Sequence, residues 1–255
     1  MFFSSVTCLF LIQHYKTKLL IFMLASFIAR TCSDLWSLLY PQYCAGCKDA
    51  LQYSEKIICT NCRIQLPRTS FRAGTGNQIE KHFWGKVEVE SAVAYLQFLK
   101  GTEVMHLLHE LKYRGNQEVG ELLGRMFASE YESSDFFSEV DYIIPVPLHE
   151  RKLKIRGFNQ CDSICKGISE ITKLPVLSRG LKRNRFNETQ TSKGRFERFA
   201  NTAELFSVNS SLLKGKRVLL IDDVITTGST LEACINPLNE IGCSVRVAAM
   251  ASPID

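Results

Sequence analysis

The sequence predicts an α/β protein in which a mostly parallel, twisted sheet is flanked by helices and preceded by a small cysteine module. Short segments with strand character alternate with segments whose apolar residues recur at helical spacing. Residues 218–221 are four apolar residues in a row, which is typical of a strand buried on both faces. Two pairs of cysteines near the N-terminus are each spaced C-x-x-C.

Length and composition suit one substantial domain with a small accessory module. The chain has 255 residues, of which 45% are hydrophobic and 22% are charged, as in ordinary soluble globular proteins. Its ten cysteines are too sparse for a secreted disulfide scaffold and favour a reducing compartment with one metal site. We therefore expect a cytoplasmic protein.

Positive charge is concentrated in the middle third of the chain. Between Arg151 and Arg198 there are thirteen Lys or Arg residues and four acidic residues, whereas the formal net charge of the whole chain is only +5. Such a region suggests a polyanionic ligand, either a diphosphate or a nucleic acid. The alternative interpretation is a solvated basic face.

The N-terminal residues 1–31 form an uncertain extension. Their longest apolar run, Leu19–Ala29, is too short to span a bilayer, so we expect no transmembrane segment. Two lysines before this run imitate a signal peptide, but no small-residue cleavage site follows and Arg30 ends the run. We prefer the hypothesis that Met23 is the true start, with residues 1–22 as an upstream extension and secretion as the alternative.

The predicted elements follow from cap residues, periodicity and breakers. Residues 32–66 are expected to form a short helix and the cysteine module, residues 67–86 a polar linker, and residues 88–255 the main domain. Alternation and apolar runs predict strands at 91–98, 140–146, 218–221 and 244–249. Cap residues and helical spacing predict helices at 33–39, 102–115, 117–131, 159–172 and 229–241.

The cysteine pairs are Cys44 with Cys47 and Cys59 with Cys62, separated by eleven residues. Two C-x-x-C turns can supply four thiolates to a closed tetrahedral site, and soft thiolates select Zn²⁺ in that geometry. Four protein ligands leave no open position, so this zinc is expected to be structural. A redox dithiol and two disulfides are the alternatives.

The most specific signal is VLLIDDVITTGST, residues 218–230. The buried strand delivers Asp222 and Asp223 to its carboxyl end, where open α/β sheets bind their ligands, and carboxylates there can accept hydrogen bonds from ribose hydroxyls. The small, hydroxyl-rich segment Thr226–Thr230 then leads into a helix, and backbone amides at a helix start suit a phosphate. The alternative is an acidic turn with a capped helix.

A second strand end is followed by a proline-stiffened, basic segment within DYIIPVPLHERKLKIRGFNQ, residues 141–160. A diphosphate needs several cations and backbone donors at close range, and Gly157 allows close approach of the backbone. A basic surface loop is the alternative.

Residues 218–230 resemble the phosphoribosyl-diphosphate motif of type I phosphoribosyltransferases, with four apolar residues, two acids and then T-T-G-S-T. Together with residues 111–115 and 141–160, the chain is similar to the competence protein F (ComF, or GntX-like) family from about Leu35 onward. That family joins an N-terminal four-cysteine, zinc-ribbon-like module to a domain with the type I phosphoribosyltransferase fold.

The resemblance implies a set of binding residues. Asp222 and Asp223 would hold the ribose hydroxyls, and residues 183–201 would form a mobile flap that closes over the site. The 5-phosphate would be held by Thr226, Thr227, Gly228, Ser229 and Thr230. The pyrophosphate would meet the loop from Val146 to Arg156, through Val146, Pro147, Arg151, Lys152 and Arg156. The flap would contribute Arg195 and Arg198.

Two functions of different classes are compatible with this resemblance. The first is a phosphoribosyltransferase of unknown acceptor, in which Mg²⁺ accompanies phosphoribosyl diphosphate and His149 is the best candidate for a general base. No glutaminase-like nucleophile precedes the domain, which speaks against amidophosphoribosyl transfer. The second is a non-catalytic adaptor in DNA uptake that binds single-stranded DNA and works with a DNA-uptake helicase, although aromatic residues are few in the basic region.

Overall fold

The computed structural model describes residues 23–24, 40–184 and 205–253. These fall into two compact units: a small unit with residues 48–59 and the described residues up to Cys44, and a large unit with residues 45–47 and 60 onward. The helix expected at 33–39 lies outside the described residues, as do the N-terminal extension apart from Met23 and Leu24 and most of the predicted flap.

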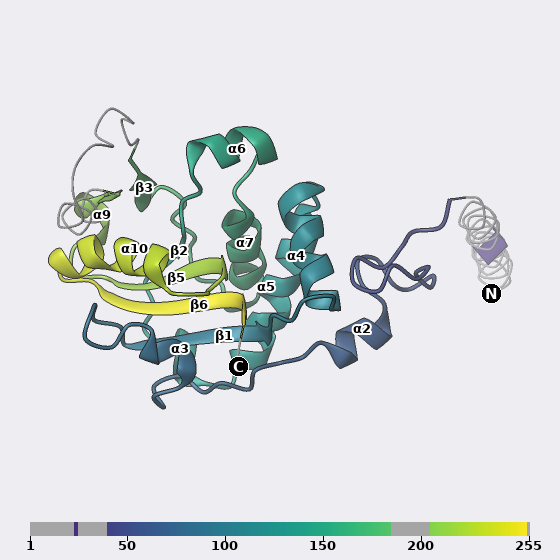
Figure 1. Ribbon diagram of the computed structural model, residues 1–255, viewed down its shortest axis with the longest axis horizontal. Helices are drawn as coiled ribbons and strands as arrows, with labels where there is room; N and C mark the ends of the chain where they lie inside the picture. Colours follow the sequence, from purple (N-terminus) through teal and green to yellow (C-terminus); the bar gives the residue numbers. More distant parts are fainter. Residues whose placement is uncertain (1–22, 25–39, 185–204, 254–255) are drawn as a thin grey trace, which may run out of the picture. The chain divides into compact units, whose positions relative to one another are not determined.

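The large unit is built on a four-stranded sheet in the order β1-β6-β5-β2 (Figure 1). All three neighbouring pairs are parallel, which confirms the predicted sheet type. Pro145 at the end of β2 lies opposite Ile221 in β5, so the carboxyl ends of the two parallel strands lie at the same edge of the sheet. The strands are β1 Ser91–Gln97, β2 Tyr142–Pro145, β5 Arg217–Val224 and β6 Ser244–Ser252.

The central strand β5 is buried on both faces, as its run of apolar residues predicts. Val218 and Leu220 belong to a core cluster that includes Leu231 of helix α10, while Leu219 and Ile221, which point the other way, are also fully buried. The four long helices occur where they were predicted, at α4 Glu103–Tyr113, α5 Gln117–Tyr131, α7 Gln160–Thr172 and α10 Ser229–Glu240.

The segment interpreted as a polar linker is part of the packed domain. Asn77 and Glu80 form a capping box around the short helix α3, Gln78–Lys81. Ile79 and Phe83 are each 1% exposed and belong to the core cluster. The linker interpretation of residues 67–86 is therefore wrong for this part, because two apolar residues among many polar ones are enough to anchor it.

The basic segment after β2 is also more ordered than the predicted loop. Residues Glu150–Arg156 form helix α6, which stands on the same side of the sheet as β3 (Figure 1). The side chain of His149 caps α6, and Gly157 ends it with a φ of 77°. Further elements that were not predicted are α2 Thr60–Gln65, the 3-10 helix η1 Asp135–Phe137, β3 Leu181–Arg183, β4 Phe206–Val208 and α9 Ser210–Leu213.

Candidate functional site

A pocket of about 180 Å³ lies at the carboxyl ends of β2 and β5. It combines the acidic end of β5 with the segment after β2 and with the first residues of α7 and α10, which are far apart in the sequence. Ligands of open α/β sheets bind at this position. The lining residues are Lys112, Val146, Pro147, Leu148, Lys152, Arg156, Asn159, Gln160, Cys161, Arg183, Asp222, Asp223, Val224 and Thr230.

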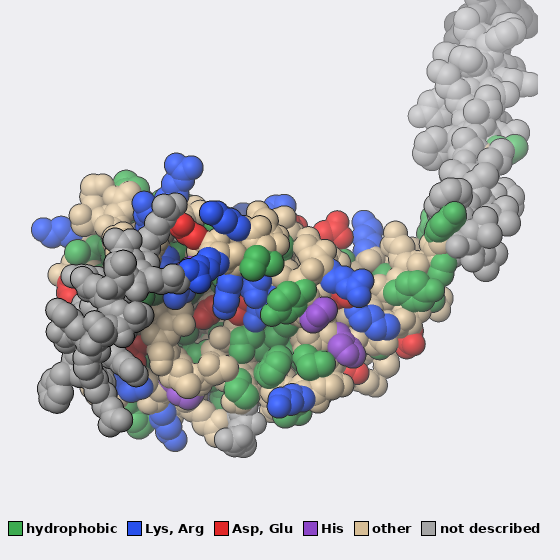
Figure 2. Space-filling model, turned by 45° about the horizontal axis from the view of Figure 1, so that its top comes forward, with side chains coloured by type: hydrophobic (Ala, Val, Ile, Leu, Met, Phe, Trp, Pro, Cys, Tyr) green, Lys and Arg blue, Asp and Glu red, His purple; other side chains and the backbone are tan. Residues whose placement is uncertain are grey.

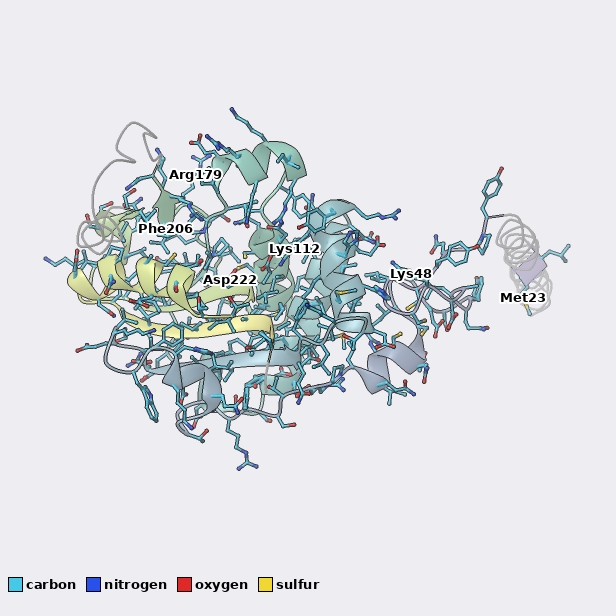
Figure 3. All side chains as sticks on the ribbon, viewed as in Figure 1. Met23, Lys48, Lys112, Arg179, Phe206 and Asp222 are labelled. Atoms are coloured by element: carbon cyan, nitrogen blue, oxygen red, sulfur yellow. The ribbon has the colours of Figure 1, made fainter. Side chains whose placement is uncertain are left out.

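The two aspartates at the end of β5 have different surroundings. Asp223 forms an ion pair with Lys112 of α4, whose Nζ lies 3.0 Å from its Oδ1. The Oδ1 of Asp222, which is labelled in Figure 3, accepts a hydrogen bond of 2.8 Å from the Asp223 amide and lies 3.8 Å from the Cys161 thiol. Burial, and then the negative charge of Asp223, raise the pKa of the Asp222 carboxyl to about 7. The Asp222 carboxyl therefore titrates near neutral pH.

Cations outnumber carboxylates around the pocket. Lys112, Lys152, Arg156 and Arg183 line it, against the two aspartates of β5. Figure 2 shows Lys and Arg side chains gathered on one face of the molecule, with acidic side chains between them. A surplus of positive charge in a confined pocket favours a ligand with several negative charges.

Two of these arginines are placed by aromatic rings. The guanidinium of Arg156 lies over the ring of Tyr113, 5.2 Å from its centroid, and that of Arg183 lies over Phe206 at 5.4 Å. Arg183 ends β3 and is paired with Phe206 at the start of β4. The predicted flap therefore begins at Arg183, which lines the pocket. Its residues 185–201, with Arg195 and Arg198, lie outside the described residues.

The hydroxyl-rich segment after β5 forms the start of α10. Gly228 is the N-cap with a φ of 77°, and a side chain there would place its Cβ 3.3 Å from Cβ of His82, so only glycine fits without strain. The cap makes no side-chain hydrogen bond to the helix. The Ser229 amide makes a long hydrogen bond of 3.5 Å to the Thr227 hydroxyl, and amides at a helix start can bind an anion.

The predicted phosphate and pyrophosphate residues are brought together only in part. Thr226, Thr227, Ser229 and Thr230 are all exposed, but of these four only Thr230 lines the pocket. Of the predicted pyrophosphate residues, Arg151 does not line the pocket, whereas four do: Val146, Pro147, Lys152 and Arg156.

His149, the candidate general base, has a structural contact instead. Its Nδ1 accepts a hydrogen bond of 3.1 Å from the Arg151 amide, which caps α6, and the residue does not line the pocket. The structure thus gives no support to a catalytic role for this histidine.

Several lining residues were not assigned a role from the sequence. Lys112, Asn159 and Gln160 lie within the segments that carry the family resemblance, and that was the signal available for them. Cys161 had no signal beyond its proximity to those segments, and Arg183 was expected only as the first residue of the flap. Their place in the pocket depends on how α7 and β3 pack against the sheet.

The four cysteines of the two C-x-x-C pairs form a cluster. The sulfur atoms of Cys44, Cys47, Cys59 and Cys62 all lie within 4.8 Å of one another. Tetrahedral zinc with Zn–S bonds of about 2.3 Å needs sulfur atoms roughly 3.8 Å apart, so the cluster suits the ion after a small contraction. These residues could therefore hold a metal such as zinc.

Gly46 lies in a closely packed part of the first C-x-x-C turn. A Cβ there would lie 3.1 Å from Cys62 Sγ and 3.3 Å from Cβ of Glu103. The Gly46 carbonyl also lies 2.8 Å from Nδ1 of His106. The close approach of Cys62 supplies the physical reason for a glycine at this position.

The fold and the pocket define a phosphoribosyltransferase-like domain, and residues 173–254 match the family described as the phosphoribosyl transferase domain. The chain belongs to the competence protein F family. It is 25% identical over 211 residues to competence protein F of Haemophilus influenzae, which covers 78% of this chain and 91% of that protein. It is 30% identical over 191 residues to DNA utilization protein YhgH of Salmonella typhimurium, covering 74% and 80%.

A third relative and one solved structure are also similar to this chain. Competence protein ComFC of Bacillus subtilis is 26% identical over 160 residues, or 62% of this chain and 61% of that protein. The solved glutamine phosphoribosylpyrophosphate amidotransferase from B. subtilis is 25% identical and covers 55% of this chain and 30% of that chain, with a TM-score of 0.41. A score this low does not by itself establish a shared fold. Among the described residues, no helix has the length and apolar character needed to cross a membrane.

Proposed function

We propose that the chain binds phosphoribosyl diphosphate, or a related sugar phosphate, in the pocket at the ends of β2 and β5. The observation that carries this proposal is the combination within one pocket of two carboxylates, four cations and the first turn of α10. Asp222 and Asp223 would accept hydrogen bonds from the ribose hydroxyls. The amides at the start of α10 would hold the 5-phosphate.

The diphosphate would lie between the segment after β2 and helix α6. Lys152 and Arg156 both line the pocket there, on one side of α6. Charge-assisted hydrogen bonds from such side chains are stronger than neutral ones. A bound Mg²⁺ would supply additional positive charge to the diphosphate. These contacts account for ligand binding and would stabilise a departing pyrophosphate if transfer to an acceptor occurs.

Calorimetry with phosphoribosyl diphosphate and Mg²⁺ tests this proposal. We expect saturable binding by the unchanged protein, weakened about tenfold or more by Lys152→Ala together with Arg156→Ala, because two charge-assisted contacts are lost. Lys154→Ala is the matched control, since Lys154 belongs to the same helix but does not line the pocket. Equal loss in the control and the double variant would contradict placement of the diphosphate beside α6.

The alternative is a non-catalytic adaptor that binds single-stranded DNA. The printed names of the relatives refer to competence and DNA utilization. On this chain, α6 carries exposed lysines, and the exposed ring of Tyr113 lies under Arg156. Stacking on an aromatic ring beside a basic helix is a common means of binding single strands.

The same calorimetric experiment separates the two functions when an oligonucleotide replaces the sugar phosphate. A surface site predicts salt-dependent binding that Lys154→Ala weakens and that replacement of Asp222 and Asp223 by Asn leaves unchanged. If the pocket serves only the sugar phosphate, replacement of Asp222 and Asp223 by Asn should weaken binding of phosphoribosyl diphosphate, and Lys154→Ala should leave it unchanged. Oligonucleotide binding that is insensitive to salt would exclude the electrostatic adaptor site.

We further propose that the four-cysteine cluster binds structural zinc. A closed set of four thiolates leaves no position for a substrate, so the ion would hold the small module together. We expect about one zinc ion per chain by elemental analysis, lost in Cys62→Ser and retained in Cys243→Ala, a control cysteine outside the cluster. Full zinc content in Cys62→Ser would contradict the proposal.

A further inference from the structure

Gln160 is an unusual residue of the pocket. It is the first residue of α7, it is 1% exposed, and it lines the pocket. Its Nε2 is the only buried side-chain nitrogen or oxygen, within the described part of the chain, that has no hydrogen-bond partner. Leaving a buried donor without an acceptor lowers the stability of a folded protein, so such a group needs an explanation.

The neighbours of Gln160 are engaged in contacts that fix its position. Asn159 caps α7 through the Cys161 amide, and its Nδ2 donates to the Val146 carbonyl at 3.0 Å. The Ser163 hydroxyl donates to the Gln160 carbonyl at 2.8 Å. The start of α7 is thereby tied to the segment after β2. Among these groups in the described part of the chain, the Gln160 Nε2 lacks a partner.

The surroundings indicate what kind of acceptor is missing. Helix α7 has 13 residues, and its N-terminus carries a partial positive charge. The lining side chains add the surplus of cations described above. An N–H donor among these groups is suited to an oxygen of a polyanion, and none of the described residues forms a hydrogen bond with it.

We propose that Gln160 is a ligand-binding residue whose side-chain amide donates a hydrogen bond to the diphosphate part of the ligand. This inference rests on the proposed function and extends it to one residue. Because the link through Asn159 places α7 next to the segment after β2, the contact is made with the diphosphate and not with the 5-phosphate at α10. Because Nε2 is buried, this contact requires the amide to turn toward the pocket.

Two small probes separate the halves of the ligand. Binding of inorganic pyrophosphate and of ribose 5-phosphate, each with Mg²⁺, is measured by calorimetry for the unchanged protein and for Gln160→Leu. We expect pyrophosphate affinity to fall about tenfold, as for loss of one hydrogen bond to a charged group, and ribose 5-phosphate affinity to stay within about twofold. The melting temperature should not fall, because leucine removes an unpaired donor.

Gln117→Leu is the matched control, since Gln117 is the first residue of α5 and lies outside the pocket. Gln160→Met, which keeps an unbranched side chain, provides the same test if the leucine variant does not fold. Unchanged pyrophosphate affinity in either folded variant would overturn the role of Gln160, and so would an equal loss for ribose 5-phosphate. Failure of the unchanged protein to bind pyrophosphate or phosphoribosyl diphosphate would overturn the proposed function as well.

Discussion

Replacement of Asp222 by Asn should weaken binding of phosphoribosyl diphosphate about hundredfold and, at pH 8, raise the melting temperature of the ligand-free protein. Binding is expected to fall because an amide offers one acceptor oxygen where the carboxylate offers two charged ones. The loss of two charge-assisted hydrogen bonds corresponds to about two orders of magnitude in affinity.

The gain in stability follows from the raised pKa of Asp222. This pKa is about 7 in the folded protein, against a usual value of 3.8, so the folded state binds the proton more tightly than the unfolded chain. The protonated carboxyl favours folding below pH 4, and this advantage is lost as the pH rises through 7. Asparagine stays neutral at every pH, so the melting temperatures of the two proteins should diverge between pH 4 and 8.

Asp223→Asn is the matched comparison for Asp222→Asn. Asp223 holds the ion pair with Lys112, whose side chain is only 20% exposed. Its replacement leaves that cation without its partner, and no gain in melting temperature at pH 8 is expected. If both variants were stabilised equally, or if Asp222→Asn bound phosphoribosyl diphosphate normally, the assignment of these carboxylates to the ribose would be wrong.

The pH dependence of ligand binding provides an independent check. Affinity should rise between pH 6 and 8 as the Asp222 carboxyl loses its proton and becomes a better acceptor. The ligand phosphates also titrate in this range. The pH dependence of affinity that remains in Asp222→Asn measures their contribution. A pH profile that does not change in this variant would remove Asp222 as the titrating group.

Much of this site was predictable because its residues form a local pattern. The apolar run of β5 gives its burial on both faces, and Asp222 and Asp223 follow at its end, so their place at the sheet edge needs no tertiary information. The C-x-x-C pairs are equally local. Gly228 could be expected before α10 because a tight turn there needs a positive φ.

The parts that were missed depend on contacts between distant segments. Lys112 reaches Asp223, 111 residues further along the chain, only because the fold brings the last turn of α4 to the end of β5. Gln160 becomes a pocket residue only through the packing of α7. Neither contact leaves a periodic signal in the sequence.

Two errors, by contrast, were avoidable from local signals. Helix α3 is preceded by Asn77 with Glu80 three residues later, which is a capping-box pattern that the polar composition of the segment concealed. Helix α6 ends at Gly157, a common helix C-terminal signal, but its many cations were interpreted as a loop. Composition was given too much weight over cap residues in both cases.

Substitution of Gly124 or Gly167 by Ala should destabilise the protein by about 3 kcal/mol or more, because α5 and α7 cross with their backbones in contact. A Cβ at Gly124 would lie 2.2 Å from the Ile164 carbonyl oxygen, and one at Gly167 would lie 2.0 Å from that of Glu121. Both obstacles are backbone atoms, which cannot move aside without separating the helices. Ordinarily, Gly→Ala within a helix stabilises it by about 1 kcal/mol, so the expected sign is reversed.

Gly120 provides a graded control on the same face of α5. A Cβ there would lie 2.1 Å from the Ser163 hydroxyl, an obstacle that belongs to a side chain and can be removed. We expect Gly120→Ala to be less harmful than Gly124→Ala, and Ser163→Gly to restore part of its stability. Thermal unfolding measures all three, at about 2–4 °C per kcal/mol for a domain of this size.

The packing of α5 against α7 also affects the position of a proposed ligand-binding residue. The Ser163 hydroxyl that meets Gly120 donates to the carbonyl of Gln160, the residue proposed to bind diphosphate. A shift of α7 caused by Gly167→Ala should therefore weaken pyrophosphate binding at temperatures where the variant is still folded. Gly167→Ala with unchanged melting temperature and pyrophosphate affinity would show that the helices do not cross this closely.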